Sequence, residues 1–234
     1  MRRFCLLTTG RAGSTALMDA IARAPDVAVP TRQLPACRDH ELVHPQTAAG
    51  HARRLARLTG RPIRSLTALI EAFFELNADL PYAGFKSMPN RHPDLDDFVR
   101  RSDLQVITLL RRDRLATAAS FLLALTQGTW RRSGGTPEFE LRLDASNRPL
   151  LRDNLAYLHR SERLLEAVPD AIRLSYEDLC EADFAAPGLD RFFGRRIRIE
   201  APRAPIRAQD YVADFAEFEA FVNGCWAELT AASD

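Results

Sequence analysis

The chain has 234 residues, which is enough for one sizeable α/β core, and we expect a single domain over residues 1–234. Apolar residues make up 46%, charged residues make up 27%, and the formal net charge is +1. This balance argues against wholesale binding to nucleic acid or membranes, so any preference for anions has to be local. The sequence indicates no membrane span, signal peptide or disulfide framework, and we therefore expect a cytoplasmic protein.

Apolar spacing predicts strands and helices that alternate along the chain. In chain order the pattern predicts a strand at 4–8, a helix at 14–24, helices at 51–58 and 65–76, a strand at 82–86, a helix at 94–101, a strand at 104–110, helices at 114–125 and 147–167, a strand at 171–176 and a terminal helix at 209–232. Residues 30–50 are rich in Pro and polar side chains and are expected to be irregular, and residues 126–138 form a loop long enough to be a mobile lid. The alternation favours a three-layer α/β/α fold with a mainly parallel sheet, which binds ligands at the carboxyl ends of its strands.

The stretch TTGRAGSTAL, residues 8–17, lies between the first predicted strand and the first predicted helix. Glycines let the backbone approach an anion, and the start of a helix presents unpaired N–H groups and the positive end of its dipole. A Walker A loop would require a Lys after its second glycine, and this loop has none. A plain turn is the alternative interpretation. The residues expected to surround an anion are Gly10, Arg11, Ala12, Gly13, Ser14 and Thr15.

A second cationic segment, LLRRDRLATAASF at residues 109–121, follows the strand at 104–110. Arg111 and Arg112 end the strand, and Ser120 lies on the helix after it. The alternative is a solvated Arg cluster, which is the usual outcome for a run of like charges. Two anion sites at neighbouring strand ends would suit a ligand with two separate phosphate groups.

These segments resemble the sulfotransferases that use 3′-phosphoadenosine 5′-phosphosulfate (PAPS). RAGST at residues 11–15 is similar to the family's 5′-phosphosulfate loop, and Arg112 with Ser120 has the spacing of its 3′-phosphate motif. SYEDL at 175–179 is similar to the segment whose Tyr, here Tyr176, lies near the adenine. RRDRLATAASFLLALTQGTW at 111–130 is similar to the bacterial branch of trehalose and nodulation-factor sulfotransferases. The resemblance spans residues 4 to about 210 in a few short blocks.

The resemblance implies a P-loop-like sulfotransferase fold that moves a sulfuryl group from PAPS to a hydroxyl or amine, with adenosine 3′,5′-bisphosphate as product and no metal. It implies a small-molecule or carbohydrate acceptor. The oligomeric state stays open on the sequence, and a homodimer is one option because carbohydrate sulfotransferases of this branch can dimerise. The resemblance also implies that Arg207, ahead of the last helix, closes over the 3′-phosphate, and it favours Arg207 over Arg203 for that contact.

The catalytic cations that the resemblance implies are Arg11 and Lys86, which is the only lysine in the chain. A coding bias toward Arg, or a surface lysine at a strand end, is the alternative explanation for Lys86. The proton acceptor is less clearly marked, because Met88 stands where cytosolic relatives have a His, and Arg32 and Gln33 stand where the trehalose branch has a Glu. The candidates, in order of preference, are Glu41, then His40, with Asp39 nearby and His92 as an outside choice.

Two other classes of function stay open on the sequence. A P-loop small-molecule kinase would require the missing Lys and a Mg²⁺-binding Asp at a strand end. A non-catalytic nucleotide-binding protein would share the anion sites without turning over a substrate. The acceptor cannot be read directly, although Trp130 with Arg131 and Arg132 suits a sugar face, an aromatic ring or an anionic acceptor.

Overall fold

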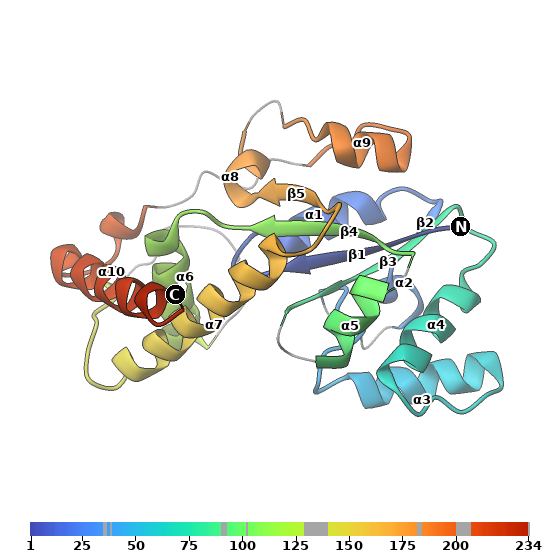
Figure 1. Ribbon diagram of the computed structural model, residues 1–234, viewed down its shortest axis with the longest axis horizontal. Coiled ribbons are helices and arrows are strands. Elements are labelled where there is room, and N and C mark those ends of the chain that lie inside the picture. The colour runs from blue at the N-terminus through green and yellow to red at the C-terminus, as the bar shows by residue number, and fades with distance from the viewer. Residues whose placement is uncertain are drawn as a thin grey trace.

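The computed structural model describes residues 1–34, 37, 39–89, 93–101, 103–128, 140–181, 184–199 and 207–233. A five-stranded sheet with all neighbouring strands parallel forms its centre (Figure 1). In spatial order the strands are β2 (Val27–Ala28), β3 (Tyr82–Ser87), β1 (Arg2–Thr8), β4 (Gln105–Leu110) and β5 (Ile172–Ser175). The expectation of an α/β fold with a mainly parallel sheet is therefore confirmed.

Every predicted strand and helix is present, with ends that differ by a few residues. The helices are α1 (Ser14–Ala22), α2 (Pro30–Gln33), α3 (Ala48–Thr59), α4 (Leu66–Leu76), α5 (Pro93–Arg101), α6 (Arg114–Gln127), α7 (Arg148–Glu166), α8 (Tyr176–Leu179), α9 (Pro187–Phe193), the 3₁₀ helix η1 (Ala208–Asp210) and α10 (Phe215–Ala231). Most of the predicted lid at 126–138 lies outside the described residues.

Four short elements were not predicted from the sequence, and two boundaries differ from the prediction. Strand β2 and helices α2, α8 and α9 were not predicted, because two to seven residues are too few to show a clear period. Tyr176 does not end a strand but opens α8, where Ser175 and Asp178 form a capping box. Asp214 caps α10, so the terminal helix begins later than the predicted residue 209.

Helices cover both faces of the sheet because alternate residues of β1 point in opposite directions. Phe4 and Leu6 belong to a core with α1 and α9, whereas Cys5 and Leu7 belong to a core with α3, α4 and α5. Figure 1 shows α9 on one side of the sheet and α3, α4 and α5 together on the other. A third core joins α6, α7 and α10. Among the described residues, no helix is long and apolar enough to cross a membrane.

The topology brings the predicted motifs to one edge. Because the strands are parallel, the segments that follow β1, β3, β4 and β5 all leave the sheet at its carboxyl edge. These segments contain the predicted anion loop, the Arg111–Arg112 pair and Tyr176, and Lys86 lies near the carboxyl end of β3 itself.

Candidate functional site

The first loop, residues 9–13, joins β1 to α1 and contains two left-handed residues. Arg11 has φ +68° and Gly13 has φ +76°. The left-handed region costs a residue other than glycine about 1–3 kcal/mol, and such strain is concentrated at functional sites. Gly13 is the N-cap of α1 and has no side chain with which to cap it. The first turn of α1 is therefore left without the side-chain cap that most helices use.

The two glycines of the first loop differ in what surrounds them. A Cβ on Gly13 would lie 2.8 Å from Cδ2 of Tyr176, so the tyrosine ring packs directly on this glycine. A Cβ on Gly10 would meet no atom within 4 Å. Gly13 is thus required by the fold itself, whereas packing against protein atoms gives no reason for a glycine at position 10.

Arg11 and Ser120, predicted at two separate phosphate sites, contact each other. Nε of Arg11 donates a hydrogen bond of 2.9 Å to Oγ of Ser120, which lies on α6. The two residues are 109 positions apart in sequence. This contact joins the loop after β1 to the helix after β4, so the two predicted anion motifs lie together at the carboxyl edge.

Tyr176 also belongs to this site, and it brings Arg111 with it. The guanidinium of Arg111 lies over the Tyr176 ring, with 4.5 Å between Cζ and the ring centroid. Arg111 is only 8% exposed, its Nε has no hydrogen-bond partner, and it forms no ion pair with any residue that the structure describes. Burial raises the pKa of Tyr176, so this ring is a neutral phenol at neutral pH. A buried guanidinium with an unused donor is a group that an anionic ligand would satisfy.

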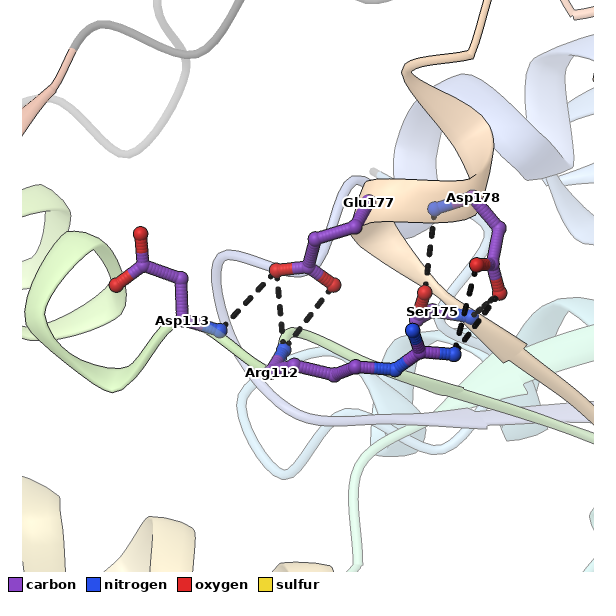
Figure 2. Close-up of polar contacts among 5 residues, drawn as sticks. All are labelled: Arg112, Asp113, Ser175, Glu177 and Asp178. Carbon is purple, nitrogen blue, oxygen red and sulfur yellow. Dashed lines mark hydrogen bonds and ion pairs between the residues drawn. The ribbon is translucent and has the colours of Figure 1, made fainter.

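Arg112 differs from Arg111 because its guanidinium is exposed and reaches Asp178, as Figure 2 shows for this contact. Its side chain is 70% exposed, and its Nη2 lies 3.4 Å from Oδ1 of Asp178. The carboxylate of Glu177 accepts hydrogen bonds of 3.1 Å from the backbone N–H groups of Arg112 and Asp113. Asp113 in turn caps α6 by accepting the N–H of Ala116. The second loop, residues 111–113, therefore has the backbone N–H groups of Arg112 and Asp113 satisfied by a carboxylate of the protein itself.

Lys86 and Glu41 form a buried ion pair next to the first loop. Nζ of Lys86 lies 3.3 Å from Oε1 of Glu41, and the two side chains are 3% and 11% exposed. The two residues also form an isolated parallel bridge, so the segment at residues 40–41 continues along β3 beyond the two residues of β2. Cys37 lies close to the pair, and burial raises its pKa to about 12, which keeps it a thiol. Lys86, one of the two predicted catalytic cations, is thus in direct contact with Glu41, the first choice of base.

His40 is buried among partners that occupy both of its ring nitrogens. Nε2 lies 2.8 Å from Oδ1 of Asp19 on α1, and Nδ1 lies 2.9 Å from Oγ1 of Thr31 on α2. Burial lowers the pKa of His40, although the hydrogen bond with Asp19 acts in the opposite direction. A neutral ring suits both contacts, since Nε2–H can donate to Asp19 and Nδ1 can accept the Thr31 hydroxyl. Neither nitrogen is left to take a proton from a substrate.

The remaining predicted residues are placed as follows. Ser14 is buried at the start of α1, and Oγ1 of Thr15 donates to Oδ1 of Asp39 over 3.4 Å. Arg207 is exposed, and its backbone N–H donates to Oδ2 of Asp210; no contact among the described residues joins it to the first loop. Other residues that the sequence analysis singled out lie outside the described part of the chain: His92, Trp130, Arg131, Arg132 and Arg203.

The sequence analysis did not single out Arg111, Asp19 and Thr31 as site residues. Arg111 was part of the quoted motif, but successive residues of an extended chain point in opposite directions, and the spacing to Ser120 favoured Arg112. Nothing in the sequence around Asp19 or Thr31 indicates contact with His40. Within the described residues, no group of three or more His, Cys, Asp or Glu side chains is arranged to hold a metal ion.

Comparison with known proteins adds no relative. No protein-family model matches the chain, and neither does any curated protein.

Proposed function

We propose that this chain is a cytoplasmic sulfotransferase with a P-loop-like sulfotransferase fold, which moves a sulfuryl group from PAPS to a hydroxyl or amine of a carbohydrate or other small molecule. The observation that carries the proposal is the hydrogen bond from Arg11 to Ser120. The sequence motif assigns these residues to the two ends of one ligand with two phosphate groups, and they lie within one hydrogen bond of each other. The alternative interpretations of the two motifs, a plain turn and a solvated Arg cluster, do not explain why Arg11 and Ser120 contact each other.

The proposed donor site uses main chain for one phosphate and side chains for the other. The 5′-phosphosulfate lies at the first loop, against the helix start that has no side-chain cap, where main-chain N–H groups and the helix dipole favour an anion. The 3′-phosphate binds Ser120 and a guanidinium of the second loop, for which Arg111 is better buried than Arg112. Tyr176 packs beside the adenine, and Arg207 closes over the 3′-phosphate.

In the proposed reaction an acceptor oxygen or nitrogen attacks the sulfur in line with the bridging oxygen of PAPS. The new bond to sulfur forms as the bond between sulfur and the 5′-phosphate oxygen breaks, and adenosine 3′,5′-bisphosphate leaves. Arg11 and Lys86 stabilise the negative charge that builds on the leaving oxygen. The proton of the acceptor passes to Glu41, which we place ahead of His40 because both ring nitrogens of His40 already have partners.

Thermal unfolding with two ligands tests the donor site. Adenosine 3′,5′-bisphosphate without Mg²⁺ is expected to raise the melting temperature, because a ligand at about 100 times its Kd stabilises the folded state by about 2.7 kcal/mol. Stabilisation by Mg-ATP, and none by the bisphosphate, would overturn the proposal in favour of a kinase.

Turnover is tested separately with PAPS and a panel of sugars, phenols and amines. Release of adenosine 3′,5′-bisphosphate that depends on the acceptor is the expected result. Binding of the bisphosphate without release for any acceptor would identify a nucleotide-binding protein that does not catalyse transfer.

A further inference from the structure

His40 links three parts of the molecule that meet at the proposed site. Its ring contacts Asp19 on α1, the helix that follows the first loop, and Thr31 on α2. Its backbone carbonyl accepts a hydrogen bond of 3.0 Å from the N–H of Lys86, a buried residue of β3. The next residue in the chain is Glu41. The backbone of His40 therefore contacts Lys86, and the residue that follows His40 is Glu41, the ion-pair partner of Lys86.

The backbone around His40 needs such support. Asp39 has φ +56° and His40 has φ +62°, so two consecutive residues other than glycine lie in the left-handed region. Each costs about 1–3 kcal/mol and persists only where surrounding contacts hold it in place. The ring of His40 is 5% exposed and has a partner on each nitrogen, which supplies contacts of that kind.

We propose that His40 is a positioning residue: its ring, held between Asp19 and Thr31, fixes the strained backbone at residues 39–41 and so places Glu41 against Lys86 beside the first loop. The role of the pair in sulfuryl transfer rests on the proposed function above. The positioning itself is a property of this chain and can be measured without any substrate.

The physical reason for a rigid support is the sensitivity of transfer reactions to geometry. A misplacement of about 1 Å can cost about 10²-fold in rate, because the reacting groups no longer meet in line. Glu41 lies on an irregular segment and not on a regular helix or strand, and its neighbours along the chain include residues with strained backbone. Loops hold catalytic groups less well than regular elements do, so a side-chain anchor next to Glu41 has a clear use.

The single lysine makes the proposal measurable. Protein labelled with ¹³C at the lysine ε-carbon gives one side-chain resonance, which belongs to Lys86. Glu41→Gln supplies the reference position for Lys86 without its carboxylate. We expect His40→Ala to move the resonance most of the way toward this reference. The matched control is His159→Gln, which changes another buried histidine, in the core of α6, α7 and α10 against Trp226, and leaves the resonance at its wild-type position.

His40→Asn separates the ring from the backbone preference. Asn tolerates the left-handed region well, yet it lacks the ring that spans Asp19 and Thr31. We expect it to move the Lys86 resonance as His40→Ala does. Recovery of the wild-type resonance in His40→Asn, or a wild-type resonance in folded His40→Ala, would overturn the proposal. If His40→Ala does not fold, Thr31→Val removes one of the two ring contacts, and we expect a smaller shift in the same direction; no shift would also overturn the proposal.

Kinetics then link positioning to the reaction. We expect His40→Asn to lower kcat by about 10- to 100-fold, while the Kd for adenosine 3′,5′-bisphosphate stays within about twofold of wild type. An equal loss of nucleotide affinity would indicate general damage to the site and would contradict positioning of the ion pair alone. If the lysine resonance moves as expected but wild-type protein neither binds the bisphosphate nor turns over PAPS, the proposed function fails while the positioning role stands.

Discussion

Two loops at the carboxyl edge of the sheet each join a parallel strand to a helix. They differ in whether a side chain of the loop caps the start of that helix. The first loop, residues 9–13, ends on Gly13, which offers α1 no side-chain cap. The second loop, residues 111–113, ends on Asp113, which caps α6, and Glu177 accepts the backbone N–H groups of Arg112 and Asp113. An external anion at the second loop would face carboxylates that already occupy the main chain.

The two loops would therefore hold the proposed ligand with two phosphate groups in different ways. At the first loop the main chain can bind an anion directly, because helix N–H groups and the dipole point toward it. Near the second loop, the groups that could bind an anion are the side chains of Ser120 on α6 and of an arginine. The charges also differ in burial, since Lys86 beside the first loop is 3% exposed and Arg112 of the second loop is 70% exposed. Substitutions in the two regions are therefore expected to have different effects.

The largest expected effect is on the free energy of unfolding, when the buried Lys86–Glu41 pair and the exposed Arg112–Asp178 pair are each broken. Lys86→Met leaves the Glu41 carboxylate buried without its ammonium partner, which should lower the free energy of unfolding by about 3–5 kcal/mol. Arg112→Ala breaks an exposed contact with Asp178 and should cost less than about 1 kcal/mol. Urea unfolding of both variants measures the difference, and equal losses would show that burial does not separate the two pairs.

The second effect concerns the glycines of the first loop. Gly13→Ala forces a side chain into a position with φ +76° and 2.8 Å from Tyr176, and should lower the free energy of unfolding by about 2–4 kcal/mol. Gly10→Ala should leave stability unchanged, since its Cβ meets no atom, yet it should weaken binding of adenosine 3′,5′-bisphosphate. A stability loss at Gly10, or unchanged nucleotide affinity in that variant, would contradict an anion site at this position.

The third expected effect is on the Kd of adenosine 3′,5′-bisphosphate, which should differ between substitutions of three arginines. Removing a charge-assisted hydrogen bond costs about 1.5–3 kcal/mol, so Arg11→Ala and Arg111→Ala should each raise the Kd of the bisphosphate by roughly 10- to 100-fold. Arg112→Ala is the matched control and should change the Kd less, because its side chain is exposed and already paired with Asp178. Titration calorimetry gives the three values. A larger loss in Arg112→Ala than in Arg111→Ala would assign the 3′-phosphate to Arg112, as the sequence spacing suggests.

The smallest expected effect is a pH dependence of the free energy of unfolding that arises from Glu162 on α7. Burial raises the pKa of Glu162 from 4.5 to about 7, with Glu166 adding to the shift and Arg114, the first residue of α6, opposing it. The folded state therefore prefers the protonated carboxyl, so its stabilising contribution is complete below pH 4.5 and is lost as the pH rises through about 7.

Glu162→Gln removes this loss of stability at high pH. Allowing for its partial exposure, the variant should be more stable than wild type by about 1–2 kcal/mol at pH 8 and no more stable at pH 4.5. Urea unfolding at both pH values is the measurement, and an equal difference at the two pH values would rule out titration of Glu162.

Part of the candidate site follows from the sequence because its signals are local. The apolar spacing around β1, α1, β4 and α6 predicts strands that lead into helices, and alternation of such units makes the strands parallel. Parallel strands end at one edge, so the first loop, Lys86, Ser120 and Tyr176 were expected to gather there. The short elements are the exception, since α8 has a recognisable capping box at Ser175 but too few residues for a period.

Other features were decided only by the tertiary structure, because they depend on contacts between distant segments. Arg11 meets Ser120 across 109 residues, and His40 finds Asp19 and Thr31 on two different helices. Which of Arg111 and Arg112 turns inward depends on the direction of a side chain at the end of β4, and a one-residue change reverses that direction. The amino-acid pattern was therefore sufficient for the fold class and for the edge at which the chemistry is expected. Packing determined that Lys86 and Glu41 at that edge form a buried pair, whereas the Nε of Arg111 is buried without a hydrogen-bond partner.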